Sequence, residues 1–388
     1  MRCLRDAGFK AYWAGGCVRD MLLGQEPADY DIATSALPDQ VIALFPRCVE
    51  VGKAFGVIQV LDGDLQYDVA TFRAEGSYSD GRRPDEVTWA DPREDVIRRD
   101  FTINGLLYDP LDDKVIDFVN GESDLKKGVI RAIGEPARRF EEDALRVLRA
   151  LRFSARLDFN IEPQTWRALE DAAPSIARIS TERIRHELER ILREGGAKQG
   201  LEMMGALGLW ELLVPELRDL PLAIKRFTIS RKLSPQVAWA NLCLDQDLSR
   251  IEIQDFGKRM RLSKGLIDKL VSTIGCATSI RAYEDLPIWD RKKVVRDTCF
   301  DDATQLLKHD ETAKDAIRAA LQELSSWSQD ELYPAPLLTG QTLAMAGYQP
   351  GPFFGRVLGE LEDLQLAGEI TTEAQALAFV KSQAPKPD

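Results

Sequence analysis

The sequence predicts an α+β fold: a small mixed sheet near the N-terminus, followed by a long all-helical part. Up to about residue 120, short β-branched runs alternate with helical ones. From about Phe140 onward, apolar residues instead recur with the 3.6-residue period of helices. The chain of 388 residues is also too long for one compact domain, so we expect several.

The sheet is predicted from short apolar runs that end at turn residues. In chain order, we expect a strand over Ala11–Ala14, a helix over Val18–Leu23, a strand over Tyr30–Ala33, a helix from Pro38 to about Phe45, and strands over Val57–Leu61 and Gln66–Phe72. The last two runs flank Asp62-Gly63-Asp64, which is a turn sequence, and they therefore predict a hairpin.

The helical part is predicted from its periodicity and its breaks. An apolar stripe interleaved with arginines runs along Ala144, Leu145, Leu148, Leu151 and Phe153. Ser180-Thr181 starts a further helix that continues to about Leu192. Breaks are expected at Gly195-Gly196 and Pro215, and passages rich in Pro and Gly, Tyr333–Gly340 and Gly347–Pro352, set off a last helical piece.

Composition narrows the class of function. The formal net charge of −12 argues against a nucleic-acid partner, yet the segment from Lys126 to Arg156 is rich in Lys and Arg, so the total hides a basic region. Six scattered cysteines without a CxxC pair indicate reduced thiols and no structural zinc. Without a membrane-length apolar run or a signal-peptide core, we expect a cytoplasmic protein with no membrane partner.

Asp29-Tyr30-Asp31 is the first candidate for catalysis. On a β-strand, residues i and i+2 point to one face, so both carboxylates can hold divalent cations. Phosphoryl transfer needs such a clamp, because charge grows on the attacking and leaving oxygens together. Alone, this pair is more often a solvated turn, so its context decides.

The context begins with Gly15-Gly16-Cys17-Val18-Arg19-Asp20, at the turn from the first strand into the first helix. Paired glycines let backbone amides approach a triphosphate, the start of the helix adds a favourable dipole, and Arg19 can add a charge-assisted contact. The alternative is a tight turn with a surface arginine. The two motifs together favour nucleotide binding.

Asp68, in the predicted strand Gln66–Phe72, supplies a third carboxylate. If this strand lies beside the first two, Asp68 comes close to the metal site. It would then act as a metal ligand or accept the proton of a 3′-hydroxyl. The alternative is a strand-end aspartate that faces solvent.

The run from Arg98 to Asn104 places polar groups directly ahead of an apolar stretch. Arg99, Asp100 and Asn104 suit a ribose, since a carboxylate accepts hydrogen bonds from hydroxyls while a guanidinium donates them. By itself, this run is also typical of a surface loop.

The run Glu142–Arg152 is expected to form a single helix with a charged face. Asp143 and Arg146 are three residues apart and so share a face, which Arg149 and Arg152 continue. A carboxylate beside a guanidinium can read the polar edge of a nucleobase as a complementary base would. The alternative is a salt-bridged solvent face, but charges crowded beside an apolar stripe favour base selection.

Together these motifs resemble the class II tRNA nucleotidyltransferases, the CCA-adding family that also contains bacterial poly(A) polymerases. The resemblance covers GGCVRDMLLG, DYDIAT, YDVATFR, RRDFTIN, DFVNGESDL, EDALRVLRALRF and ERIRHELERIL, in family order over about residues 11–192, and a final part with LLTGQTLAMAG, PGP and QLAGEI. One departure is Gly105, where the family usually has alanine. Glycine lowers helix propensity there but removes no functional group.

This resemblance implies a polymerase-β-like nucleotidyltransferase head over residues 1–125, a neck over 126–200, a body over 201–325 and a tail over 326–388. It implies two Mg²⁺ ions on Asp29 and Asp31, triphosphate contacts from Gly15, Gly16 and Arg19, ribose contacts from Arg99, Asp100 and Asn104, and base selection by Asp143 and Arg146 with Arg149 and Arg152 nearby. Asp68 falls at the family's third carboxylate, and Asp117–Asp124 resembles the hinge that reorients the head. The implied substrates are CTP, ATP and tRNA, and no protein partner is implied.

Members of this family add CCA, only CC, only the final A, or poly(A). Enzymes that add only CC lack a flexible loop after the third carboxylate, and Ala74–Asp95 supplies that loop here. A short tail and an acidic charge favour tRNA over the generic RNA of a poly(A) polymerase. CCA addition is therefore the predicted activity, and addition of A alone stays open. Candidate contacts to tRNA phosphates are Lys258, Arg259, Arg261, Lys264 and Lys269, although a solvated helix face explains them equally well.

Two other classes of protein fit less well. A catalytically inactive RNA-binding protein on the same fold would not need the aspartate pair and the glycine turn, and both are present. A small-molecule nucleotidyltransferase would share the head but would not need the long helical part that follows the base-selecting motif.

Overall fold

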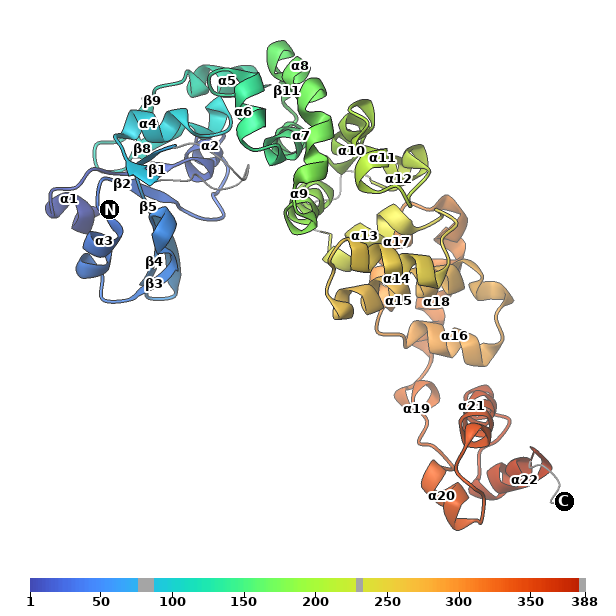
Figure 1. The fold of residues 1–388 in the computed structure, drawn as a ribbon. Helices are drawn as coiled ribbons and strands as arrows, with labels where there is room; N and C mark the ends of the chain where they lie inside the picture. Colours follow the sequence, from blue (N-terminus) through green and yellow to red (C-terminus); the bar gives the residue numbers. More distant parts are fainter. Residues whose placement is uncertain (76–86, 228–232, 384–388) are drawn as a thin grey trace. The chain divides into compact units, whose positions relative to one another are not determined.

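The computed structural model describes residues 1–75, 87–227 and 233–383, and the chain divides into two compact units, residues 1–232 and 233–388. The first unit contains the sheet and the helices that follow it, and the described part of the second is helical (Figure 1). The α+β prediction is thereby confirmed. The finer boundaries at residues 125, 200 and 325 stay predictions. No helix in the described ranges is both long enough and apolar enough to cross a membrane.

Seven strands form the main sheet in the order β3-β4-β5-β2-β1-β8-β9. Their bounds are β1 Ala11–Ala14, β2 Ile32–Thr34, β3 Cys48–Gly52, β4 Val57–Asp62, β5 Leu65–Thr71, β8 Leu106–Asp109 and β9 Lys114–Asp117. β2 runs parallel to β5, with Ile32 opposite Val69, and the other neighbouring strands are antiparallel. The predicted hairpin is confirmed as β4–β5.

Helices cover the sheet on both faces. The short elements of this region are α1 Arg2–Asp6, α2 Gly16–Leu22, α3 Pro38–Leu44, α4 Pro92–Ile97, the 3₁₀ turns η1 Lys53–Phe55 and η2 Thr102–Asn104, and a separate pair of strands, β6 Arg73–Glu75 and β7 Val87–Trp89. Ile32 packs in one hydrophobic cluster with Val41 of α3, while the next residue, Ala33, packs in another with Val96 of α4. Successive side chains of a strand point to opposite faces, so both faces of β2 are buried. A shift of β2 by one residue would exchange these faces, and the buried contacts therefore fix the register of the strand beside the site.

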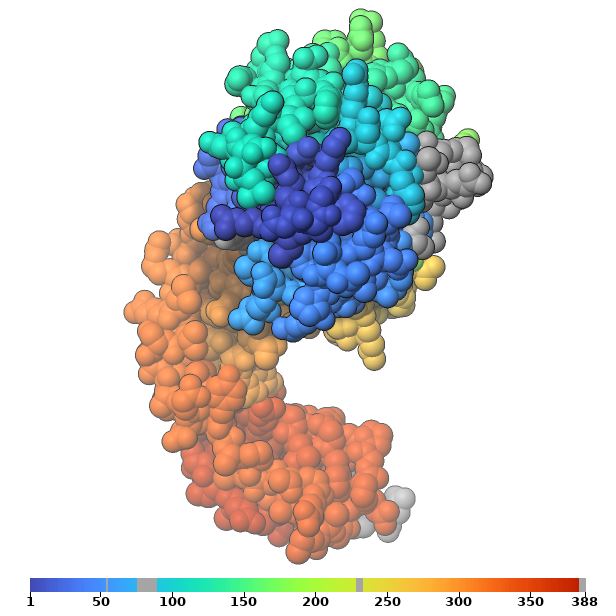
Figure 2. Space-filling model, turned by 90° about the vertical axis from the view of Figure 1, so that its left-hand side faces the viewer, coloured from blue at the N-terminus to red at the C-terminus, as the bar shows by residue number. Residues whose placement is uncertain are grey.

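Further helices complete the first unit, and the teal and green atoms at the top of Figure 2 belong to this part of the chain. They are α5 Gly121–Lys127, α6 Pro136–Glu142, α7 Leu145–Leu157, α8 Pro163–Ala172, η3 Ala173–Arg178, α9 Thr181–Arg193, α10 Ala197–Ala206, α11 Leu209–Leu213 and α12 Leu220–Arg226, with β10 Val129–Ile130 beside β11 Asn160–Ile161. α7 packs against α9 and α10 and buries Leu148 and Leu151 completely.

The single helix predicted over Glu142–Arg152 is wrong. Asp143 has extended backbone angles, φ −150° and ψ 102°, so α6 ends before it and α7 begins at Leu145. The Oδ1 atom of Asp143 accepts a hydrogen bond from the backbone N–H of Leu145 at 3.0 Å. Aspartate competes with the helix in this way, because its side chain bonds to nearby backbone groups when it stands just before a helix.

The described part of the second unit is built from ten helices that begin, in several cases, at a capping serine. The helices are α13 Pro235–Cys243, α14 Arg250–Arg259, α15 Lys264–Arg281, α16 Ile288–Val295, α17 Phe300–Leu307, α18 Lys314–Ser326, α19 Gln329–Leu332, α20 Gly340–Met345, α21 Pro352–Ala367 and α22 Glu373–Gln383, with the 3₁₀ turns η4 Tyr283–Asp285 and η5 Glu311–Ala313. The hydroxyls of Ser234, Ser249 and Ser263 accept from the third N–H of α13, α14 and α15, and each such cap contributes about 1 kcal/mol. The breaks predicted on either side of α20 are confirmed.

Candidate active site

A polar pocket of about 370 Å³ opens in the first unit, beside the start of α2 and the first turns of α7. Its lining consists of Gly15, Gly16, Arg19, Asp31, Arg73, Arg98, Arg99, Asp100, Asn104, Asp143, Arg146, Arg149 and Phe153. Arginines outnumber aspartates two to one in this lining, although the formal net charge of the whole chain is −12. The local charge is therefore positive, and the pocket suits a polyanion such as a triphosphate.

The predicted glycine turn forms one wall of the pocket. Gly15 follows β1 with φ 74°, in the left-handed region that glycine adopts readily, and Gly16 begins α2. A Cβ atom on Gly15 would lie 2.8 Å from Nη1 of Arg99. Gly15 therefore serves both the turn and the close passage of a guanidinium, and a side chain there would push Arg99 away from the pocket.

Arg19 is a buried pocket arginine rather than a surface one, since only 2% of it is exposed. Its Nε and Nη2 lie 2.8 and 2.7 Å from Oδ1 of Asp20, and its Nη1 donates to Oδ1 of Asn104 at 2.6 Å. Burial lowers the pKa of Arg19, against the raising effect of Asp20. The neighbouring carboxylate and amide thus fix the direction of this guanidinium.

The three predicted carboxylates come together, although two of them lie outside the strand expected to carry them. β2 begins at Ile32 rather than Tyr30, so Asp29 and Asp31 directly precede it. The parallel register of Ile32 with Val69, carried back one residue, sets Asp31 beside Asp68. Enclosure, and then repulsion from the carboxylates of Asp29 and Asp68, raise the pKa of Asp31 to about 6, while Arg99 opposes the rise. Of these three aspartates, Asp31 lines the pocket.

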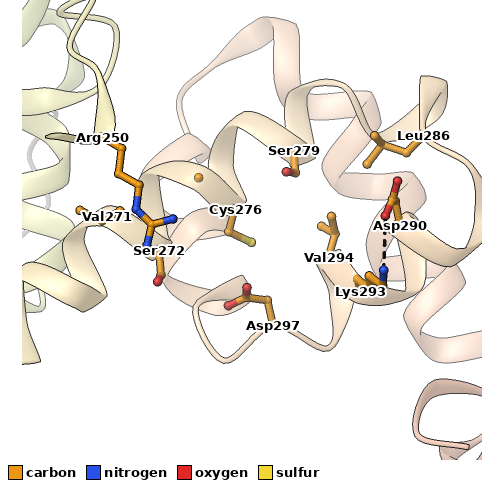
Figure 3. Close-up of a pocket in the computed structure, with 11 residues that line it drawn as sticks. Arg250, Val271, Ser272, Cys276, Ser279, Leu286, Asp290, Lys293, Val294 and Asp297 are labelled. Carbon is orange, nitrogen blue, oxygen red and sulfur yellow. Dashed lines mark ion pairs between the residues drawn. The ribbon is translucent and has the colours of Figure 1, made fainter. Parts of the chain in front are cut away.

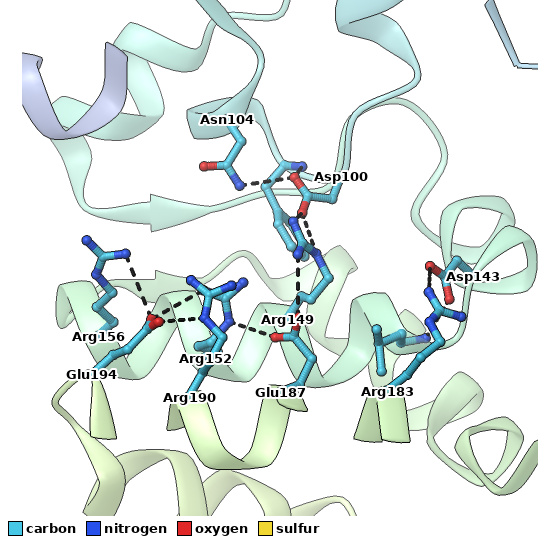
Figure 4. Close-up of polar contacts among 12 residues, drawn as sticks. Asp100, Asn104, Asp143, Arg149, Arg152, Arg156, Arg183, Glu187, Arg190 and Glu194 are labelled. Atoms are coloured by element: carbon cyan, nitrogen blue, oxygen red, sulfur yellow. Dashed lines mark hydrogen bonds and ion pairs between the residues drawn. The ribbon is translucent and has the colours of Figure 1, made fainter. Parts of the chain in front are cut away.

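Asp100 lines the pocket, and both of its carboxylate oxygens are engaged by hydrogen bonds (Figure 4). Its Oδ1 accepts from the Phe101 N–H at 2.8 Å and from Nδ2 of Asn104 at 3.0 Å, and its Oδ2 accepts from Nε and Nη2 of Arg149 at 2.9 and 2.5 Å. Burial alone would raise the pKa of Asp100, but Arg149 and these bonds outweigh it and lower the pKa to about 2. With both oxygens engaged, Asp100 orients its neighbours, and its direct contact to ribose stays a prediction.

A residue that the motifs did not reveal, Asp95 of α4, holds two of the pocket arginines. It is 1% exposed, and its carboxylate accepts from Nη2 of Arg98 at 2.7 Å and from Nη2 of Arg99 at 3.0 Å. Burial would raise the pKa of Asp95, but these two guanidinium groups lower it. The sequence offered one indication of this role: Asp95 stands three residues before Arg98 and four before Arg99, at the end of α4.

Asp143 and Arg146 both line the pocket, and each is held by a different partner. Oδ2 of Asp143 accepts from Nη2 of Arg183 at 2.7 Å. Nη1 of Arg146 donates to Oε2 of Glu142 at 2.9 Å. The predicted convergence of these two residues is therefore present, but it results from the break between α6 and α7 and not from a shared helix face.

Arg152 lies outside the lining of the pocket, and its predicted role in base selection stays a prediction. It is 1% exposed, and its guanidinium donates to Glu187 of α9 at 2.7 Å and to Glu194, the residue after α9, at 3.4 Å. Six residues along α7 rotate Arg152 by about 120° from Arg146, so Arg152 faces α9 and joins the two helices.

Gly105 stands after η2 and not in a helix, so the argument from helix propensity is wrong. A Cβ atom there would lie 2.8 Å from Cγ2 of Val119 and 3.0 Å from Cδ1 of Ile133. In this chain, the packing of those two side chains leaves no room for the methyl group of alanine.

Two features implied by the family resemblance stay predictions. Within Asp117–Asp124, the carboxylate of Asp117 accepts from the N–H groups of Val119, Gly121 and Glu122, so this connection is an ordered turn. The loop Ala74–Asp95 is described at its two ends, and its middle, residues 76–86, lies outside the described residues.

A second cavity, of about 510 Å³, lies in the second unit between α15 and α16 and contains none of the predicted site residues (Figure 3). Among its lining residues is Cys276, where burial and then repulsion from Asp297 raise the thiol pKa to about 12, so this sulfur is protonated at neutral pH. Of the predicted tRNA-binding cations, Lys258 donates to Asp255 at 2.8 Å, and Arg259 lies 5.7 Å from the ring centre of Phe256. The contacts of these cations with tRNA stay a prediction.

Comparison with known families agrees with this geometry. A family model described as the Poly A polymerase head domain matches residues 11–131, and one described as the probable RNA and SrmB-binding site of polymerase A matches residues 158–220. The sheet, the glycine turn and the aspartate pair all lie within the first match. The first unit therefore contains the head of a nucleotidyltransferase that acts on RNA.

Relatives that match almost the whole chain narrow the class. The CCA-adding enzyme of Levilactobacillus brevis is 35% identical over 383 residues, covering 97% of this chain and 94% of its own, and that of Leuconostoc mesenteroides is 37% identical over 391 residues, covering 96% and 92%. The crystal structure of the Bacillus stearothermophilus CCA-adding enzyme in complex with CTP matches with a TM-score of 0.83 at 26% identity, covering 98% of this chain and 95% of that one. The chain belongs to the family of CCA-adding enzymes.

Proposed function

We propose that this chain adds CCA to the 3′ end of tRNA, using CTP and then ATP and releasing diphosphate at each step. The observation that carries the proposal is the convergence of three kinds of residue on one pocket: Asp31 for the metal, Gly15 and Gly16 for the triphosphate, and Asp143 with Arg146 for the base. Membership of the CCA-adding enzymes supports tRNA as the acceptor. A tRNA substrate and six free cysteines also fit the cytoplasmic location that we propose.

Asp29 and Asp31 are the proposed ligands of two Mg²⁺ ions. Their carboxylates and that of Asp68 lie close enough to repel one another, and a divalent cation would relieve this repulsion. The described part of the chain brings no three His, Cys, Asp or Glu side chains together tightly enough to enclose a metal. Two carboxylates are nevertheless sufficient for Mg²⁺, which takes its other ligands from substrate phosphates and water. When bound, the ions would neutralise charge on the attacking and leaving oxygens.

The nucleotide's phosphates are assigned to the glycine turn and the arginines beside it. Gly15 and Gly16 leave the backbone open to close approach, while Arg19 and Arg99 flank the turn. Arg99 is also the best placed of the three predicted ribose ligands, since the side chains of Asp100 and Asn104 are bonded to each other, whereas Arg99 is held from behind by Asp95. Asp68 remains the candidate for a further metal ligand or for the acceptor of the 3′-hydroxyl proton.

Base selection is assigned to Asp143 and Arg146. An ionised carboxylate only accepts hydrogen bonds and a guanidinium only donates them. Cytosine and adenine both offer an amino group to the carboxylate next to a ring acceptor for the guanidinium, whereas uracil and guanine offer a keto group that the carboxylate repels. One acidic and one basic side chain therefore suffice to accept CTP and ATP and to reject UTP and GTP.

Incorporation assays on two acceptors test the activity. The protein should extend tRNA that ends before CCA with CTP and ATP, and tRNA that ends in CC with ATP alone. Failure to incorporate CTP on the first acceptor would replace CCA addition by addition of A alone, and a long run of A would identify a poly(A) polymerase.

Asp31→Ala tests the metal assignment. We expect it to abolish incorporation and to leave tRNA binding, measured by filter retention, close to wild type. Asp64→Ala, in the exposed turn of the β4–β5 hairpin, is the matched control and should remain active. Full activity of Asp31→Ala would refute the assignment, and absence of incorporation by the unaltered protein would identify an RNA-binding protein without catalysis.

A further inference from the structure

Arg183, a residue of α9 within the stretch ERIRHELERIL to which no role was assigned from the sequence, contacts the proposed base-selecting carboxylate. Its Nη2 donates to Oδ2 of Asp143 at 2.7 Å, across 40 positions of the chain (Figure 4). The two side chains are 21% and 19% exposed, so the pair is largely shielded from water. A bond between a guanidinium and a carboxylate in such a place is stronger than a surface ion pair.

Asp143 needs an anchor of this kind because it belongs to no helix. It occupies the break between α6 and α7, where its backbone is extended. Its Oδ1 is held by the N–H of Leu145 at the start of α7, and its Oδ2 is held by Arg183 from α9. Two elements thus fix the plane of the carboxylate from different sides, and loss of Arg183 would leave the side chain free to turn about its Oδ1 bond.

Arg183 itself does not line the pocket, whereas Asp143 does. Any effect of Arg183 on the substrate must therefore pass through the carboxylate that it holds. The contact also joins α9 to the residue that precedes α7, so the direction of Asp143 depends on how these two helices pack against each other.

We propose that Arg183 is a positioning residue for nucleotide selection, which holds the Asp143 carboxylate in the plane where it accepts from the amino group of cytosine or adenine. This inference rests on the proposed role of Asp143 in base selection. A site that discriminates by paired hydrogen bonds loses discrimination when one partner is no longer held in direction. Arg183 therefore governs the choice between amino and keto bases more than the rate of the reaction with the correct one.

The test measures kcat/KM for CTP and UTP on tRNA that ends before CCA, in wild type and variants. Arg183→Ala should reduce the CTP-to-UTP ratio roughly tenfold, the size of effect expected from one charge-assisted hydrogen bond of about 1.5 kcal/mol. Arg183→Lys, which keeps a donor, should restore part of the ratio. Arg193→Ala, which removes a cation paired with Glu189 at 3.1 Å within the same helix, should leave the ratio unchanged.

Asp143→Asn separates this inference from the proposal on which it rests. If Asp143→Asn loses selectivity and the double variant Asp143→Asn/Arg183→Ala loses no more, Arg183 acts through Asp143. If Asp143→Asn loses selectivity while both Arg183 variants keep it, the inference falls and the base-selecting role of Asp143 stands. If Asp143→Asn keeps wild-type selectivity, Asp143 does not select the base, and the inference about Arg183 is refuted with it. Should Arg183→Ala fail to fold, as judged by its melting temperature, a wild-type ratio for Arg183→Lys and for Arg183→Gln would overturn the inference.

Discussion

Arg149 of α7 donates two hydrogen bonds to Oδ2 of Asp100, a residue that lies 49 positions earlier in the chain. The same guanidinium lies 3.6 Å from Glu187 of α9 and 5.4 Å from the ring centre of Phe153. Arg149 thereby ties the segment that follows α4 to the helices that follow the sheet. The contact stabilises the wall of the pocket, so Arg149 has a structural task besides the base-selecting one predicted for it.

Removal of Arg149 is expected to destabilise the first unit. Arg149→Ala would leave the Asp100 carboxylate buried without its countercharge, which costs about 3–5 kcal/mol. Arg138→Ala is the matched control, because Arg138 is exposed and its ion pair with Glu142 at 3.3 Å is worth less than about 1 kcal/mol. Urea unfolding followed by intrinsic fluorescence measures both changes. Equal effects of the two variants would contradict this account.

Acid should weaken the fold through Asp100. Its pKa in the folded protein is about 2, below the value of about 3.9 for an unfolded chain. A lowered carboxyl pKa contributes stability that is present above pH 4 and is lost as the pH falls toward 2, here about 2–3 kcal/mol. In Asp100→Asn, the free energy of unfolding should therefore vary less steeply between pH 4 and pH 2, by about one proton. Asp64→Asn should keep the wild-type slope, and an unchanged slope in Asp100→Asn would show that this carboxylate does not titrate there.

Asp95→Asn is expected to weaken the binding of nucleotide. The neutral amide holds Arg98 and Arg99 less firmly, so the arginines of the pocket lose direction. We expect the KM for CTP to rise roughly tenfold, since a charge-assisted hydrogen bond contributes about 1.5–3 kcal/mol, with a smaller change in kcat. Glu94→Gln makes the same chemical change one residue earlier, at an exposed position, and should leave KM unchanged. A KM shift of equal size in both variants would speak against Asp95.

Gly105→Ala should destabilise the first unit by about 1–3 kcal/mol, because the added methyl group meets Val119 and Ile133 at 2.8 and 3.0 Å. Gly359→Ala in α21 meets nothing within 4 Å and should instead stabilise the second unit by up to about 1 kcal/mol. Calorimetry that separates the unfolding of the two units measures both. Stabilisation by Gly105→Ala would show that its neighbours yield easily.

Arg146→Ala is expected to lose selection between nucleotides more than it loses folding. The arginine lines the pocket and supplies the donor side of the proposed base contact. Misincorporation of UTP and GTP, assayed with all four nucleotides on tRNA that ends before CCA, is the measurement. Unaltered selectivity, with a lowered melting temperature, would show that Arg146 stabilises the fold through its ion pair with Glu142 and does not select the base.

Local sequence signals predicted four of the seven strands of the main sheet, because turn residues and alternating apolar runs act over a few positions, and they missed β3, β8 and β9. They failed where a side chain competes with the backbone. The side chain of Asp143 accepts from the N–H of Leu145, the first residue of α7, and its extended backbone interrupts a helix that the apolar period continues through. β2 likewise begins at Ile32, later than its apolar and aromatic composition indicates, although the Asp31 carbonyl still accepts from the Ala14 N–H of β1 at 3.0 Å.

The candidate site was predictable where a motif carries its own chemistry, as Gly15, Arg19 and Asp31 do. The partners that orient these groups were not. Asp95 and Arg183 are ordinary charged residues in the sequence, and their roles arise only when distant elements are packed together. Arg152 shows the converse, because a periodic charge pattern does not reveal whether a face meets solvent, a ligand or another helix.

The parallel register of β2 and β5 determines where the chain tolerates an inserted or deleted residue. A residue inserted into the turn at Gly63 lies at the far end of the hairpin and leaves Asp31 and Asp68 beside each other. A residue inserted between Asp68 and Val69 moves the Asp68 side chain to the opposite face of the sheet, because side chains alternate at every position. Natural variation in length is therefore expected to collect at the hairpin turn and to spare the few codons around Asp68.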